Sequence, residues 1–211
     1  MMIYLSKLTF DMSKWEARRD LNNPYEMHRT LMRAFASKAN GGPGRVLFRI
    51  ELAQADCSPV VLVQSDKQPD WSKLDLGSLV VAPQCKSFSP RFVADQRVMF
   101  RLRANPTSRH RSDDGITDGK RLGLFTEVAQ MAWLARKGNL GGFQILSVKA
   151  APEGIVRTIK EKTGSPLTHF AVRFDGMIAV IDPVLFEKIL MDGVGPAKGF
   201  GFGLLSLARA T

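Results

Sequence analysis

The residues best suited to chemistry are Tyr25 and His28, which lie three positions apart in the sequence. They follow an Asn-Asn-Pro segment that is typical of a helix start, so a helix over 24–37 would place both side chains on one face. Helix starts attract phosphate, and histidine changes charge near neutral pH. The pair could therefore bind a phosphodiester and move its protons. Alternatively, His28 is only a boundary residue beside the apolar Met27.

A second candidate is segment 97–111, which contains no acidic residue. It carries five arginines: Arg97, Arg101, Arg103, Arg109 and Arg111. Alternation along the strand predicted over 96–104 places Arg101 and Arg103 on the face opposite its apolar side chains. Such a ladder could hold the phosphates of a nucleic acid, or it could simply be a solvated strand face.

The third candidate is a glycine-rich loop near the end of the chain. Its glycines are Gly193, Gly195, Gly199, Gly201 and Gly203, and Lys198 adds a cation. The spacing is not that of a phosphate-binding P-loop, and no helix follows the loop. Glycine at this density lets the backbone approach another chain segment closely, either around a ligand or in a tight packing loop.

Other polar residues carry weaker signals. Arg157, Lys160 and Lys162 form a second basic cluster, on a hairpin arm that either meets RNA or is solvated. The spacing of Asp113, Asp114 and Asp118 fits no calcium loop, and no metal site is predicted there. His169, next to Phe170 in a predicted strand, is interpreted as structural.

The elements that must position these residues occur in the order β-α-β-β-α-β twice. The first round has strands at 2–10, 45–52, 59–65 and 78–82, and helices at 24–37 and 71–76, with 15–21 as a charged connection. The second has strands at 96–104, 143–148 and 204–208, extended segments at 169–174 and 177–181, an arm at 155–160, and helices at 126–137 and 183–191. The fold class is therefore α+β, with two tandem ferredoxin-like domains over 1–90 and 91–211, joined by a linker at 87–90.

The charge indicates the kind of partner. The 211 residues include 30 lysines and arginines against 20 acidic residues, a net charge of +10, and most of the excess lies after residue 90. Nucleic acid is the expected polyanionic partner. The longest stretch without a charged side chain is 138–148, too short to span a membrane. Cys57 and Cys85 have no metal-ligand spacing, and we expect a reduced, cytoplasmic protein.

Four segments together resemble one known family, the CRISPR repeat-processing endoribonucleases of the type I-E (Cascade) system, in the RAMP superfamily. They are 23–31 (NPYEMHRTL), 100–106 (FRLRANP), 127–134 (EVAQMAWL) and the glycine-rich tail 193–207. The family is built of tandem ferredoxin-like RNA-binding domains, in agreement with the predicted element order.

The resemblance implies an activity. Such enzymes cut the CRISPR precursor at the base of the repeat stem-loop without metal or cofactor. The 2′-hydroxyl attacks the phosphate, leaving 2′,3′-cyclic phosphate and 5′-hydroxyl ends, and the enzyme stays on the hairpin as a Cascade subunit. The family's catalytic histidine and tyrosine match His28 and Tyr25. A cation from Lys7, Lys160 or Lys162 would stabilise the phosphorane.

The remaining candidate residues are expected to hold the RNA hairpin: Arg101, Arg103, Arg109, Arg111, Arg157, Lys160 and Lys198. Two alternatives stay open at this point. One is a non-catalytic subunit that binds RNA hairpins on the same fold. The other is a DNA-binding or regulatory module, which leaves the Tyr25 and His28 pair without a role.

Overall fold

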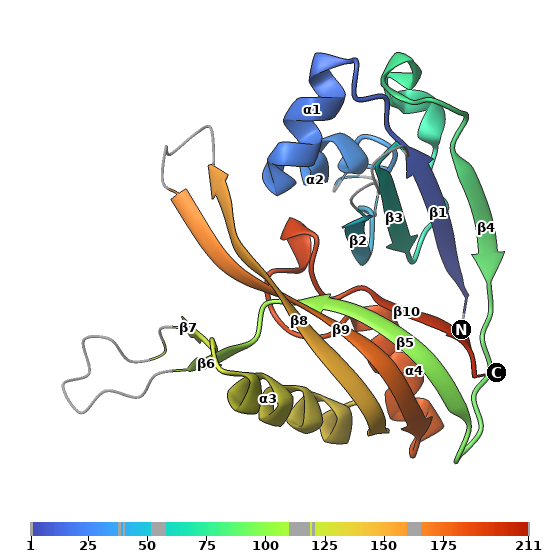
Figure 1. The fold of residues 1–211 in the computed structure, drawn as a ribbon. Helices are drawn as coiled ribbons and strands as arrows, with labels where there is room; N and C mark the ends of the chain where they lie inside the picture. Colours follow the sequence, from blue (N-terminus) through green and yellow to red (C-terminus); the bar gives the residue numbers. More distant parts are fainter. Residues whose placement is uncertain are drawn as a thin grey trace.

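The computed structural model describes residues 2–37, 39, 41–51, 58–109, 119, 121–159 and 166–210. Its first half forms a four-stranded antiparallel sheet in the order β2-β3-β1-β4. The strands are β1 (Ile3–Thr9), β2 (Val46–Glu51), β3 (Val60–Ser65) and β4 (Gln84–Phe88). Helices α1 (Trp15–Asn22) and α2 (Pro24–Met32) pack on one face of this sheet (Figure 1).

The second half repeats this plan with the strand order β10-β5-β9-β8. The strands are β5 (Arg97–Ala104), β8 (Phe143–Ile159), β9 (Pro166–Val180) and β10 (Leu205–Arg209). Helices α3 (Glu127–Leu140) and α4 (Pro183–Asp192) cover the face turned away from the first half (Figure 1). A short ribbon of β6 (Thr107–Arg109) and β7 (Arg121–Gly123) precedes α3.

The α+β class and the two-sheet architecture predicted from the sequence are confirmed. In each half, the first and third strands of the round lie in the centre and the second and fourth at the edges, which is the ferredoxin-like arrangement. The division into domains at residue 90 stays a prediction.

Four predictions for the first half were wrong in detail. Residues 15–22 form helix α1 rather than a connection, because its buried face is only Ala17 and Asp20 and gives no apolar stripe. Helix α2 ends at Met32 rather than at 37, since the next amides bond three residues back.

The other two corrections concern the end of this half. The predicted helix at 71–76 is instead two 3-10 turns, η2 (Trp71–Lys73) and η3 (Leu76–Ser78), capped by Asp70 and Asp75. The fourth strand is Gln84–Phe88 rather than 78–82, and it takes in part of the predicted linker. Every residue of this strand is exposed, so no apolar alternation marks it, yet it pairs along β1.

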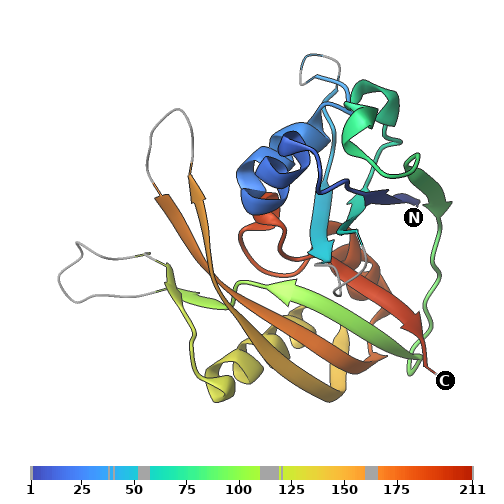
Figure 2. The same ribbon diagram turned by 45° about the horizontal axis from the view of Figure 1, so that its top comes forward.

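In the second half, the strand at 143–148 and the arm at 155–160 belong to one 17-residue strand, β8. Its ladder with β9 contains two register shifts, which bend the pair into a long twisted arm beside α1 and α2 (Figures 1 and 2). The polar loop expected over 105–120 includes strand β6, which pairs with β7 directly after that segment. The caps predicted at Thr126 and Asp182 are confirmed.

Each half has its own apolar core, and specific contacts join the halves. Gln64 on β3 donates a 2.8 Å hydrogen bond to the carbonyl of Leu190 on α4. Arg49 on β2, only 3% exposed, donates to the carbonyls of Arg101 and Leu204 at 3.2 and 3.3 Å. These buried bonds fix the glycine-rich loop after α4 against the first sheet. Within the described residues, no helix is long and apolar enough to cross a membrane.

Candidate RNA-cleavage site

His28 lies where the sequence predicts, on α2 at the margin of its buried stripe. Met27 beside it is fully buried, whereas His28 is half-buried. Its ring stacks on Phe48 of β2, with centroids 6.4 Å apart and planes inclined by 23°. Burial lowers the pKa of His28 below its ordinary value of 6.5. The imidazole is therefore neutral at neutral pH, the form that accepts a proton.

Tyr25 occupies the first turn of α2, three residues before His28, so the two side chains share a face. Asn23 caps the helix by accepting a 3.2 Å hydrogen bond from the Tyr25 amide, and Pro24 takes the first helical position. This turn is half-buried at Tyr25. The helix start predicted from the Asn-Pro segment is thus confirmed. It sets the direction in which the side chains of Tyr25 and His28 leave the helix.

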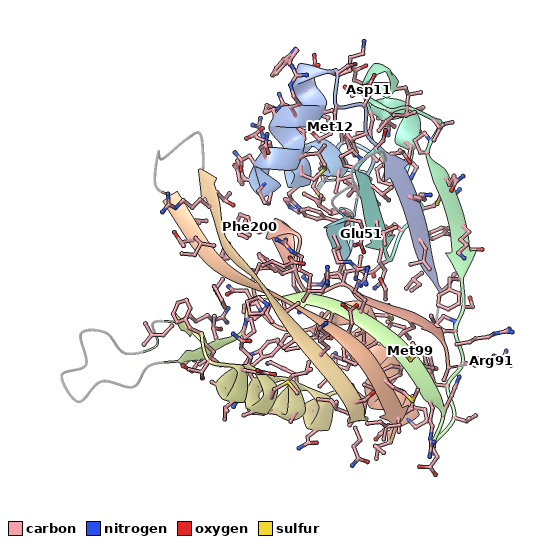
Figure 3. All side chains as sticks on the ribbon, in the orientation of Figure 1. Asp11, Met12, Glu51, Arg91, Met99 and Phe200 are labelled. Carbon is pink, nitrogen blue, oxygen red and sulfur yellow. The ribbon has the colours of Figure 1, made fainter. Side chains whose placement is uncertain are left out.

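The glycine-rich loop supplies the opposite wall of the site. Its 3-10 turn η4 (Lys198–Phe200) packs against α2 and β2. A β-carbon built on Gly199 would lie 3.9 Å from Cε1 and Nε2 of His28. The imidazole is therefore held between Phe48 and the backbone of η4. In Figure 3, Phe200 marks this turn between the two halves.

The other glycines let this loop pack closely. Gly195 has φ of +81°, and a β-carbon there would lie 2.7 Å from the Trp133 ring. Gly193, Gly201 and Gly203 also have positive φ and close neighbours, on Leu47, Phe48 and Val194 respectively. Only glycine fits such backbone without strain. The glycines therefore do allow close packing of this loop, one of the two roles considered from the sequence. This packing brings η4 into contact with His28.

Beside η4 opens a cavity of about 740 Å³ between α3, α4 and the β6–β7 ribbon. Its described lining holds six cations and one carboxylate: Arg109, Arg121, Arg136, Lys137, Lys188, Lys198 and Asp192. Lys188 pairs with Asp192 at 2.9 Å, which leaves a large positive excess. We call this the cationic cavity.

Two lysines of the cationic cavity show the effect of this crowding. Burial and the neighbouring Arg136 and Arg121 lower the pKa of Lys137, and burial and Arg45 lower the pKa of Lys198. A bound phosphate would oppose both shifts by favouring the charged ammonium. The cavity is therefore suited to an anionic ligand, and Arg109 and Lys198 were the two lining residues predicted from the sequence.

The predicted arginine ladder has carboxylate partners. Arg101 donates to Asp175 at 2.5 Å and lies 3.6 Å from Glu51 of the first half. Arg103 donates to Glu153 at 2.6 Å. Strand β5 itself has no acidic residue. The carboxylates come from the neighbouring strands of its sheet and from Glu51 of the first half. Contact of Arg101 and Arg103 with RNA stays a prediction, and the ion pairs reduce the charge they offer.

The remaining predicted residues are placed as follows. Arg157 is exposed on the arm of β8. Lys7 lines a different groove, on the face of the first sheet away from α2, and so does not face His28. Arg111, Lys160, Lys162 and the aspartates at 113, 114 and 118 lie outside the described residues. Among the residues the structure describes, no group of three or more His, Cys, Asp or Glu side chains could hold a metal ion.

Several residues of the site were missed by sequence reasoning. Phe48 looks like an ordinary core residue of a strand, and its stacking on His28 depends on tertiary packing. Arg136 and Lys137 lie near the C-terminal end of α3, where basic residues also complement the helix dipole. Sequence order does not show that they lie near Lys198 in the fold. A count of basic residues at helix ends would, however, have identified them as candidates for phosphate binding.

Two ferredoxin-like halves, with a half-buried histidine beside a cation-lined cavity, are suited to binding RNA. The comparisons identify the family. The family model described as "CRISPR associated protein" matches residues 3–209, so the chain belongs to that family. The resemblance found in the sequence is thereby confirmed.

Two relatives and one solved structure match nearly the whole length of the chain. The chain is 41% identical to "CRISPR-associated endoribonuclease Cse3" of Thermus thermophilus over 216 residues, covering 98% of this chain and 100% of that protein. It is 31% identical to "CRISPR system Cascade subunit CasE" of Escherichia coli, covering 98% and 99%. A solved structure of Cse3 bound to 19-nucleotide RNA superposes with a TM-score of 0.89 at 40% identity, covering 99% and 100%.

Proposed function

We propose that this chain is a metal-independent endoribonuclease that cuts CRISPR precursor transcripts at the base of the repeat stem-loop. The observation that carries the proposal is the imidazole of His28, held between Phe48 and Gly199 next to the cationic cavity. The similarity to a protein named endoribonuclease and to an RNA-bound structure supports the substrate class.

In the proposed reaction, neutral His28 takes the proton of the 2′-hydroxyl as the 2′-oxygen attacks the adjacent phosphorus. The bond from phosphorus to the 5′-oxygen breaks, and that oxygen takes a proton from water to become a hydroxyl, while protonated His28 returns its proton to the solvent. The products are a 2′,3′-cyclic phosphate and a 5′-hydroxyl, so the step needs no oxidant or external nucleophile. Positioned proton transfer of this kind is worth about 10²- to 10⁴-fold in rate.

The other site residues hold the substrate. Tyr25, on the same face of α2, orients the 2′-hydroxyl or the scissile phosphate. The cationic cavity, including Arg109 and Lys198, holds the phosphates of the hairpin, since duplex RNA is recognised through phosphates and 2′-hydroxyls. Arg101, Arg103, Arg111, Arg157 and Lys160 are proposed to extend this contact. Stabilisation of the phosphorane by Lys160 or Lys162 also remains part of the proposal.

We further propose that the protein stays on the cut hairpin and acts as a subunit of Cascade. The support is the similarity to the E. coli protein named Cascade subunit CasE. A surface with this positive excess retains a polyanionic product well.

The test compares cleavage and binding of a CRISPR-repeat hairpin RNA by wild type and His28→Ala. We expect cleavage to fall at least about 10²-fold with nearly unchanged affinity, because only a proton-transfer group is lost. Equal cleavage by both proteins would overturn the role of His28. Tight binding without cleavage by wild type would identify a non-catalytic hairpin-binding subunit, and equal affinity for duplex DNA would favour a DNA-binding module.

A further inference from the structure

A second cavity, of about 440 Å³, lies between the β6–β7 ribbon, the arm of β8 and β9, and η4. Its walls are mainly apolar: Phe125, Phe170, Phe200, Ile155 and Leu167. We call it the aromatic pocket. Its volume is in the range of small-molecule sites, large enough for a flat heterocycle.

The aromatic pocket exposes side chains that would normally be buried. Phe125 is 66% exposed and Ile155 is 57% exposed. The rings of Phe125 and Phe170 lie 4.9 Å apart and are tilted by 60°. Neither Phe125 nor Ile155 belongs to the apolar cores of the described residues. Exposed apolar surface gathered around a cavity marks a binding site.

His169 gives the pocket an uncharged polar wall. The side-chain oxygen Oδ1 of Asn105 accepts a hydrogen bond from the backbone amide of Phe170 at 3.3 Å, so the side-chain nitrogen Nδ2 of Asn105 faces His169 Nδ1 at 3.1 Å. Nδ1 is then the acceptor, and the proton of the neutral ring lies on Nε2. Burial lowers the pKa of His169 and keeps the ring neutral. Nε2 is buried, and it has no hydrogen-bond partner among the residues that the structure describes.

The ring of His169 also lies 4.9 Å from Phe200 and 5.7 Å from Phe202. The pocket is therefore mainly aromatic, and Arg121 is the one charged residue in its described lining. The neutral ring of His169 offers no charge to a phosphate, whereas the aromatic side chains of the lining offer a base surfaces for stacking. His169, which was interpreted as structural from the sequence, thus lines the aromatic pocket.

The aromatic pocket adjoins the cationic cavity, and both are lined by Thr107, Arg121 and Pro196. Turn η4 links them to the site, because Lys198 lines the cationic cavity, Gly199 faces His28 and Phe200 lines the aromatic pocket. Proteins bind unpaired nucleotides in this way: cationic side chains contact the phosphates, and aromatic rings stack on the base.

We propose that the aromatic pocket binds one unpaired nucleobase of the RNA, next to the nucleotides held at His28. This inference rests on the proposed function, since it names a base-binding subsite for the same RNA. It assigns Phe125, Phe170 and Phe200 to stacking on the base, with His169 as part of the wall. The pocket would thus add recognition of a nucleotide outside the paired stem.

The experiment is an abasic scan of the repeat hairpin RNA. A 2′-deoxy nucleotide at the cut blocks cleavage, and a single abasic nucleotide is moved through the unpaired positions. Affinities are measured for wild type, Phe125→Leu and Phe125→Trp. Phe125 is exposed, so these variants should keep the fold, and thermal unfolding checks this. Val128→Ala is the control, because Val128 is 82% exposed on α3 and does not line the pocket.

We expect one abasic position to weaken binding by wild type about 5- to 100-fold, the effect of losing one stacked base. Phe125→Leu should lose a similar factor on intact RNA but little more on RNA abasic at that position. Phe125→Trp and Val128→Ala should resemble wild type.

Two results would overturn the inference while leaving the proposed function standing. One is that Phe125→Leu binds intact RNA as well as wild type does. The other is that its loss multiplies with the abasic loss at every position, which shows that the side chain and the base do not interact. If wild type neither binds nor cuts the intact hairpin, the proposed function fails as well, and that outcome is distinguished by cleavage of unmodified RNA.

Discussion

The backbone of Gly199 lies against the imidazole of His28, so that a β-carbon at position 199 would be 3.9 Å from Nε2. The two residues come from different halves of the molecule, one on the first helix pair and the other on the loop before the last strand. The site is complete only when the halves are docked. The hydrogen bonds of Arg49 and Gln64 that hold the halves together therefore also form the site.

The dependence of cleavage on pH should report His28. Because burial lowers its pKa below 6.5, the proton-accepting form is already dominant above that pH. The second-order rate constant for cleavage should therefore rise with pH, with a midpoint below 6.5, and then level off. A rate that falls through this range would assign His28 as the acid instead.

His169 provides the control for this profile, since burial lowers its pKa as well. We expect His169→Asn to keep the same rise and His28→Ala to lose it. A midpoint above 6.5 in wild type would contradict the role given to the burial of His28.

The cationic cavity should dominate the salt dependence of RNA binding. Arg136→Ala with Lys137→Ala removes two of its cations, so affinity should fall. The slope of log K against log salt should become shallower by about 0.7–0.9 for each phosphate that the protein no longer neutralises. Titrations of labelled hairpin RNA at several salt concentrations measure both quantities.

The matched control removes two exposed cations elsewhere, through Lys86→Ala with Arg91→Ala. Lys86 lies on β4, and Arg91 lies at the far edge of the second sheet in Figure 3. Their removal should change the slope little. If both double variants lose the same amount, only the net charge matters and the cavity is not the RNA site.

The glycine-rich loop should not tolerate a side chain at position 195. An alanine there places its methyl group 2.7 Å from the Trp133 ring at φ of +81°. We expect Gly195→Ala to lower the free energy of unfolding by about 1–3 kcal/mol more than Gly154→Ala does. Gly154 also has positive φ, +90°, but open space around it, so the difference isolates the packing cost. Equal losses in urea unfolding would refute the close packing of this loop.

Local signals were enough to find part of this molecule from its sequence. The Asn-Pro start and the spacing of Tyr25 and His28 are properties of one helix, and α2 begins as predicted. Alternation along β5 also placed its buried and exposed faces correctly. Such features need only neighbours within a few residues.

Other features depend on residues far apart and were not predictable. Arg101 looks unopposed along its strand, but Asp175 faces it from β9. The cationic cavity collects side chains from two helices, a ribbon and a loop, and none of these segments is basic enough to indicate it alone. Strand β4 was misplaced because all of its residues are exposed and its pairing with β1 leaves no pattern.

The central claim is tested most directly by cleavage of the repeat hairpin RNA in excess EDTA, with analysis of the ends, beside the same RNA carrying a 2′-deoxy nucleotide at the cut. The account predicts cleavage that survives EDTA, leaves a 2′,3′-cyclic phosphate and a 5′-hydroxyl, and stops with the 2′-deoxy RNA. Cleavage that requires a divalent metal, or that proceeds without the 2′-hydroxyl, would contradict it.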